Sequence, residues 1–204
     1  MKKILVVLIS MVVISMSTAA QDKKPSFGVK AGLNLSIFSA SINSESSWLP
    51  GFHIGCYLKQ PLSEKIYFRP ELYYSIQGQK DKYIQPPNGP TLGNTTTKLS
   101  YVNVPLLFEF GNKVSFQAGP QVGLLISAKE SGTILNQQID DDLKGITKGV
   151  DFSFVLGTGI RLGEDLSLGA RINLGLSEIF DDSGDGDFPS IKNRVFHFYL
   201  GYRF

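Results

Sequence analysis

The stretch Val195–Phe204, VFHFYLGYRF, decides the fold of this 204-residue chain. Large apolar side chains occupy every second position up to the last residue, and they are Phe196, Phe198, Leu200, Tyr202 and Phe204. Most of the positions between them are polar or small. Because successive side chains of a β-strand point to opposite faces, the pattern predicts a barrel strand with one face in lipid and the other in the lumen. It also resembles the C-terminal signal by which the outer-membrane assembly machinery recognises its substrates.

The same alternation recurs in seven earlier segments, which are 27–35, 51–60, 66–77, 101–110, 114–126, 151–162 and 166–176. Together with the terminal strand they predict an all-β fold, an eight-stranded antiparallel up-and-down transmembrane β-barrel closed by pairing of segment 27–35 with 195–204. The connections alternate in length. Residues 61–65, 111–113 and 163–165 are predicted periplasmic turns, and residues 36–50, 78–100, 127–150 and 177–192 are predicted extracellular loops.

The N-terminus has the pattern of a secretory signal peptide. Lys2 and Lys3 precede an apolar run, and Thr18, Ala19 and Ala20 supply small residues for cleavage. We therefore predict a signal peptide over 1–20 and an outer-membrane barrel domain over 21–204. A soluble lipocalin-like barrel or sandwich would place the apolar face inside instead. The leader, the loop asymmetry and the terminal Phe204 together favour the membrane barrel.

Charge and cysteine content exclude several other classes. Without Lys2 and Lys3 the basic and acidic residues are equal in number, so no nucleic-acid partner is expected. Cys56 is the single cysteine, which excludes an internal disulfide. The expected surroundings are outer-membrane lipid and the barrel assembly machinery, and the expected state is a monomer.

Several segments carry a family resemblance across the mature chain: GVKAGLNLS (28–36), FRPELYYSIQG (68–78), YVNVPLLFEF (101–110), AGPQVGLL (118–125) and DFSFVLGTGI (151–160). In this order and spacing they resemble the porin-like, PorT-type outer-membrane β-barrel family of Gram-negative bacteria. The resemblance implies the fold and the compartment, and it brings no catalytic motif.

Charged residues at predicted lumen positions are the main candidate site: Lys30, Lys59, Arg69, Glu71, Glu109, Asp151, Arg161, Arg171 and Arg203. An eight-stranded barrel is just wide enough for side chains to fill its interior, so these charges are predicted to pair, with Arg69 and Glu71 near the centre. A polar conduit for small solutes is the open alternative.

No cofactor, metal or catalytic residue is predicted. The acidic segment 181–187 matches a calcium loop in part, but its twelfth position is Lys192 rather than Glu, which favours a solvated loop. His53 and His197 are the only histidines and both fall on the lumen face, which does not favour a hydrolase at the lipid face. The leading prediction is a porin-like outer-membrane protein with a structural, adhesive or limited transport role. The alternative is an envelope interaction module whose long loops bind a surface or secretion-machinery partner.

Overall fold

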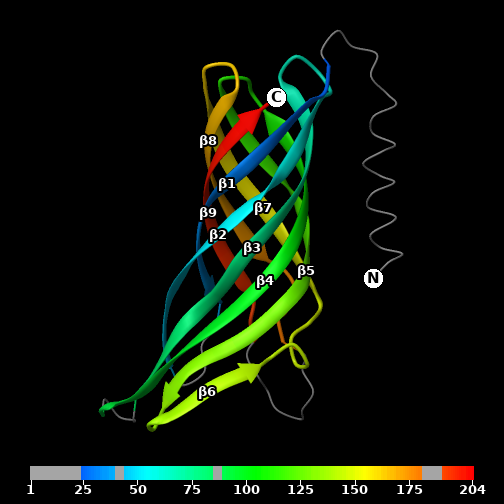
Figure 1. Ribbon diagram of the computed structural model, residues 1–204. Helices are drawn as coiled ribbons and strands as arrows, with labels where there is room; N and C mark the ends of the chain where they lie inside the picture. Colours follow the sequence, from blue (N-terminus) through cyan, green and yellow to red (C-terminus); the bar gives the residue numbers. More distant parts are fainter. Residues whose placement is uncertain (1–23, 40–43, 85–88, 181–189) are drawn as a thin grey trace.

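In the computed structural model, which describes residues 24–39, 44–84, 89–180 and 190–204, the chain forms a closed antiparallel barrel (Figure 1). Eight strands make the ring: β1 (Ser26–Phe38), β2 (Ser44–Pro61), β3 (Ile66–Ile84), β4 (Thr91–Phe110), β5 (Val114–Ile134), β7 (Val150–Leu162), β8 (Leu166–Gly175) and β9 (Asn193–Arg203). The predicted signal peptide 1–20 and the acidic segment 181–187 lie outside the described residues.

The first and last strands close the ring. β1 pairs with β9 in a register that places Leu33 opposite Phe198 and Val29 opposite Tyr202. Every other neighbouring pair is also antiparallel and follows chain order, apart from a short extra strand inserted after β5. The predicted eight-stranded up-and-down barrel is confirmed.

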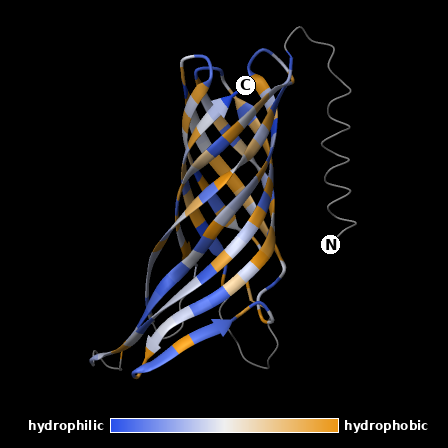
Figure 2. Cartoon of the chain, viewed as in Figure 1, coloured by the Kyte–Doolittle hydropathy of each residue, from blue (hydrophilic) through white to orange (hydrophobic). Residues whose placement is uncertain are grey.

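Alternation along each strand separates a lipid face from a lumen face. In β9, Phe196, Phe198, Leu200 and Tyr202 are exposed, whereas Val195, His197 and Tyr199 are buried. Exposed apolar residues recur in the same way around the barrel. In Figure 2 the hydrophobic positions are concentrated in the part of the ring near the tight turns, whereas the projecting strands are mostly hydrophilic. Within the described residues, no helix is long and apolar enough to cross a membrane.

The strands reach well beyond the segments that apolar alternation predicted. β3 runs to Ile84, β4 starts at Thr91, and β5 continues to Ile134. Much of 78–100 and 127–150 is therefore paired sheet rather than loop. β6 (Gln137–Asp142) folds back on β5 and lies outside the ring. The prediction of long loops here was wrong because loss of apolar alternation marks the edge of the lipid, whereas ladder hydrogen bonding continues past it.

The two ends of the barrel therefore differ in shape. Tight turns and the C-terminus lie at one end, and the extended strands with β6 project from the other (Figure 1). Gly111 and Gly163 have φ of 109° and 75° in two of the tight turns, a backbone region that glycine tolerates without strain. Short turns face the periplasm in outer-membrane barrels, so the extended sheet projects outside the cell.

Candidate functional site

The barrel interior is occupied by charged side chains in its periplasmic half. Six of the nine predicted lumen charges lie in one hydrogen-bonded group, which we term the ion-pair cluster: Lys30, Lys59, Arg69, Glu71, Glu109 and Arg171. They come from β1, β2, β3, β4 and β8 and all point into the lumen, since each occupies an inward position of its strand.

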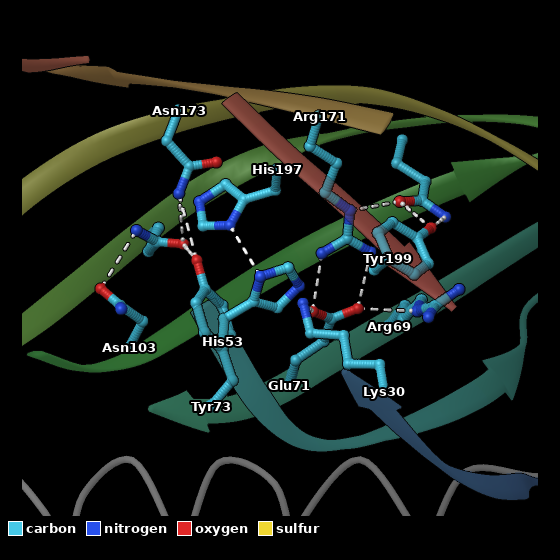
Figure 3. Close-up of polar contacts among 12 residues, drawn as sticks. Lys30, His53, Arg69, Glu71, Tyr73, Asn103, Arg171, Asn173, His197 and Tyr199 are labelled. Carbon is cyan, nitrogen blue, oxygen red and sulfur yellow. Dashed lines mark hydrogen bonds and ion pairs between the residues drawn. The ribbon is translucent and has the colours of Figure 1, made fainter. Parts of the chain in front are cut away.

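Glu71 is the centre of this cluster (Figure 3). Its carboxylate accepts two hydrogen bonds from Arg171, both at 2.7 Å, in the bidentate geometry that favours arginine–carboxylate pairs. It also accepts Lys30 Nζ at 2.5 Å and Arg69 Nε at 2.8 Å. Because Arg171 lies on β8 and Glu71 on β3, this contact spans the lumen and braces opposite walls of the barrel.

Glu109 is the second carboxylate of the cluster and is joined to the first by an arginine. It accepts Lys59 Nζ at 2.5 Å and Arg69 Nη1 at 2.8 Å, and Gln117 Nε2 donates to it at 3.1 Å. Arg69 thus bridges both carboxylates. The cluster holds four cations against two carboxylates and carries two positive charges in excess.

Tyrosine rings cover the cations of the cluster. Lys30 Nζ lies 4.0 Å from the ring centroid of Tyr73, and the Arg69 guanidinium lies 3.9 Å from that of Tyr57. The Arg171 guanidinium lies 4.7 Å from the ring of Tyr199. Such cation–π contacts stabilise cations that have been removed from water, which compensates in part for the small number of carboxylates.

A neutral polar layer lies next to the cluster on its extracellular side. The two histidines of the chain meet here, with His197 Nδ1 at 3.3 Å from His53 Nδ1, which in turn lies 2.6 Å from Asn34 Oδ1. Tyr73 Oη donates to Gln121 Oε1 at 2.6 Å and accepts from Asn173 Nδ2 at 3.1 Å (Figure 3). Sequence reasoning missed this layer as a unit, although its members all occupy inward positions of the predicted strands.

An apolar cluster closes the extracellular end of the lumen. Its buried members are Phe38, Leu99, Tyr101, Leu125, Ala128 and Ile179. Leu99 and Ala128 are completely buried. From the periplasm outward the interior is therefore charged, then neutral and polar, then apolar, and each layer is filled by side chains.

Three predicted lumen charges lie outside the ion-pair cluster, which corrects the expectation of a single network of nine. Asp151 is buried near the extracellular end and accepts Ser177 Oγ at 2.8 Å. Arg161 and Arg203 lie at the periplasmic mouth, where Arg203 Nη2 donates to the Glu164 carbonyl at 2.5 Å. The face of each strand was predicted correctly, but these residues sit at strand ends, at a depth where the cluster does not reach.

No three His, Cys, Asp or Glu side chains in the described part of the chain are grouped so as to hold a metal ion. Cys56 is a free, half-buried thiol. The candidate calcium loop 181–187 lies outside the residues described.

The geometry defines a transmembrane β-barrel with an apolar outer face and a filled, charged interior. A family profile, the outer membrane protein beta-barrel domain, matches residues 19–181, and the chain belongs to this family. The protein is therefore an outer-membrane β-barrel protein of the bacterial envelope. No curated protein showed a significant match in sequence.

Solved structures with the same fold include two bacterial proteins. Neisserial surface protein A is similar with a TM-score of 0.52 at 13% identity, over 89% of this chain and 100% of that protein. Ail, the attachment invasion locus protein of Yersinia pestis, is similar with a TM-score of 0.50 at 11% identity over the same shares. At these identities the likeness shows the fold alone.

Proposed function

We propose that this protein is an adhesive outer-membrane protein, in which a plugged barrel anchors an extracellular β-sheet that binds anionic polymers at cell surfaces. The observation that carries this proposal is a group of lysines on the outer face of the projecting sheet. The filled lumen supports it, because a plugged barrel serves as an anchor rather than a conduit.

The lysine face consists of Lys80 and Lys82 on β3, Lys98 on β4 and Lys129 on β5. All four side chains are exposed, and the residues that alternate with them along the strands point to the other face. Lys98 pairs directly with Lys129 across the ladder. Directly opposed like charges cost about 0.2–1 kcal/mol, so an anionic ligand would relieve a repulsion built into this sheet.

Acidic groups near the lysine face leave most of its charge free. The Lys82–Glu45 pair is loose, with 3.8 Å between Nζ and Oε2. Asp142 lies opposite Lys129 on β6, but its Oδ1 accepts the backbone N–H of Lys144 at 2.9 Å.

Buried hydrogen bonds hold the strands of the lysine face in place. Gln79 and Asp81 are buried on the inner side of the projection, where Ser46 Oγ donates to Asp81 at 2.6 Å and Gln79 Nε2 donates to it at 2.9 Å. A ligand would therefore meet a prearranged surface, which reduces the ordering cost of binding.

Binding of dextran sulfate to the protein in nanodiscs of neutral lipid tests the adhesive role, with uncharged dextran as comparison. We expect saturable binding that weakens at high salt, because the contacts are exposed charges. The double variant Lys98→Gln/Lys129→Gln should weaken binding about tenfold or more, consistent with loss of two charge-assisted contacts. Its charge-matched control is Lys65→Gln/Lys113→Gln at the periplasmic turns, which should bind as the wild type does. Equal loss in both variants would refute the lysine face.

Single-channel recording in planar bilayers tests the plugged anchor separately. We expect no steady openings from the wild-type barrel. Regular openings would instead favour limited transport of small solutes, the conduit interpretation of the same lumen charges.

Further expectations complete the proposal. Residues 1–20 direct export, the terminal aromatic strand is recognised by the barrel assembly machinery, and the mature protein is a monomer without enzymatic activity. The PorT-type resemblance of the strand motifs is kept here as a proposal about subfamily.

A further inference from the structure

The periplasmic mouth of the barrel contains a small cavity beneath the ion-pair cluster. Its volume is about 30 Å³, and its walls include Arg69, Arg161, Tyr57, Ser115 and Ser167. A single water needs about 10–15 Å³ of such space, so a group of a few atoms fits. The cavity lies between the turns that carry Asn112 and Glu164 and opens toward the periplasm.

Arg69 lies on the wall of this cavity and has one unused donor in its buried guanidinium. The residue is 4% exposed, and its Nε and Nη1 are bonded to Glu71 and Glu109. Nη2 is buried and has no hydrogen-bond partner among the residues that the structure describes. A buried guanidinium N–H without a partner is costly, so this atom favours a ligand that accepts hydrogen bonds.

Arg161 adds a second free cation at the same place. Its backbone N–H donates to the Lys113 carbonyl at 2.8 Å, but its guanidinium makes no hydrogen bond or ion pair within the described part of the chain. Arg203, at the same mouth, is engaged by the Glu164 carbonyl and lies 3.8 Å from Asp165. Glu109 is engaged by Lys59, Arg69 and Gln117.

The charge balance of the interior points the same way. The ion-pair cluster carries two formal positive charges in excess, and the mouth adds Arg161 and Arg203 against Glu164 and Asp165, so the excess of two remains. Buried charge without a counter-charge is strongly unfavourable. A negative group placed in the cavity would lie beside Arg69 and Arg161 and lower this excess.

We infer that the periplasmic mouth is a binding site for a small inorganic anion, held by the Arg161 guanidinium beside Arg69. The hydroxyl group of Ser115 on the cavity wall is a further donor for it. This site lies at the opposite end of the barrel from the lysine face and stands independently of the adhesive role.

Thermal unfolding of the folded barrel in detergent, measured against phosphate concentration, tests the inference. Ionic strength is held constant with a bulky sulfonate that exceeds the cavity. A ligand that binds the native state raises stability with its concentration, so the unfolding temperature should rise saturably with phosphate. Arg161→Gln, which removes no side-chain hydrogen bond or ion pair among the described residues, should weaken the apparent affinity about tenfold, the scale of one lost charge-assisted hydrogen bond.

Two further variants separate the site from a general salt effect. Lys65→Gln removes an exposed positive charge from a neighbouring turn and should respond to phosphate as the wild type does. Glu164→Gln removes a carboxylate from the mouth and should strengthen phosphate binding. Equal phosphate responses of Arg161→Gln and Lys65→Gln would overturn the site.

Bromide soaked into crystals of the barrel locates the anion directly. We expect an anomalous peak in the cavity beside Arg161 in the wild type and a weakened peak in Arg161→Gln. Bromide peaks at other surfaces with none in this cavity would overturn the inference.

Discussion

Replacing Glu71 by Gln is the most informative perturbation of the barrel interior. The carboxylate of Glu71 is fully buried and accepts hydrogen bonds from three cations, Lys30, Arg69 and Arg171. Its loss leaves Glu109 as the sole carboxylate of the ion-pair cluster and raises the positive excess from two to three. Removing one partner of a buried ion pair costs about 3–5 kcal/mol, and here a single carboxylate serves three partners. We expect Glu71→Gln to lower the free energy of unfolding by at least that amount.

The sign of the charge excess makes a sharper test than the size of the loss. Arg171→Met removes a cation and lowers the excess from two to one, while Glu71 keeps Lys30 and Arg69 as partners. The Arg171→Met variant also loses the 2.7 Å hydrogen bond from Arg171 Nε to Gln117, which contributes about 0.5–1.5 kcal/mol to stability. Glu71→Gln should therefore destabilise the barrel more than Arg171→Met, although the latter truncates the larger side chain.

Urea unfolding in lipid vesicles, followed by tryptophan fluorescence and by heat-modifiable gel migration, measures both variants. Glu45→Gln is the matched control, because Glu45 is exposed and its 3.8 Å pair with Lys82 is a surface pair worth at most about 1 kcal/mol. A Glu71→Gln barrel within about 1 kcal/mol of the wild type would refute the paired interior. If Arg171→Met lowered the free energy of unfolding more than Glu71→Gln does, the proposed excess of positive charge would be refuted.

Three other changes test the packing of the barrel and its projection. Gly169→Ala should destabilise the barrel by about 1–3 kcal/mol in the same urea assay, because a Cβ at this position would lie 2.2 Å from the Tyr199 ring. Gly145→Ala is the control, because a Cβ at Gly145 would meet no atom within 4 Å. Leu99→Ala should cost about 2–5 kcal/mol, since this completely buried side chain fills the apolar cluster; a smaller cost than 1 kcal/mol would mean the cluster is loosely packed. Leu135→Gly should slow hydrogen exchange of the β6 amides by relieving a φ of 50°, and faster exchange would contradict this.

The barrel could be predicted from sequence because lipid on the outer face and a polar lumen on the inner face require apolar and polar residues to alternate along each strand. Inside the lipid, every second residue must be apolar, so strand faces and the closing pair β1–β9 follow from alternation. Outside the lipid that rule ends. Thr95 and Thr97 are buried on the inner face of the projection, yet their stretch has no apolar alternation and was predicted to be a loop. The pairing of β3, β4 and β5 there depends on ladder bonds that composition does not reveal.

The sequence predicts which strand face each charged residue occupies, but not its position along the barrel axis. Alternation assigns Glu71 and Arg161 to the lumen equally well. Which cations reach Glu71 depends on the stagger of one strand against the next, and that places Arg171 across the lumen and Arg161 at the mouth. The unpaired Nη2 of Arg69 could not be predicted either. Glu71 lies two residues away on the same strand face and bonds Arg69 Nε, so the sequence suggests a fully paired arginine, and only the three-dimensional packing leaves Nη2 without a partner.

The barrel interior and the lysine face should act as independent units. Lys98 pairs with Gly78, which lies seven residues along β3 from Glu71, a separation of roughly 23 Å at strand rise. Sites that far apart without shared partners give additive free energies to within about 0.5 kcal/mol. The combination of Glu71→Gln with Lys98→Gln should therefore lose the stability of the first variant and the dextran sulfate affinity of the second, and no more. Larger losses in either measurement would mean that strain in the plug reaches the projecting sheet through β3, and the barrel would then be more than an anchor.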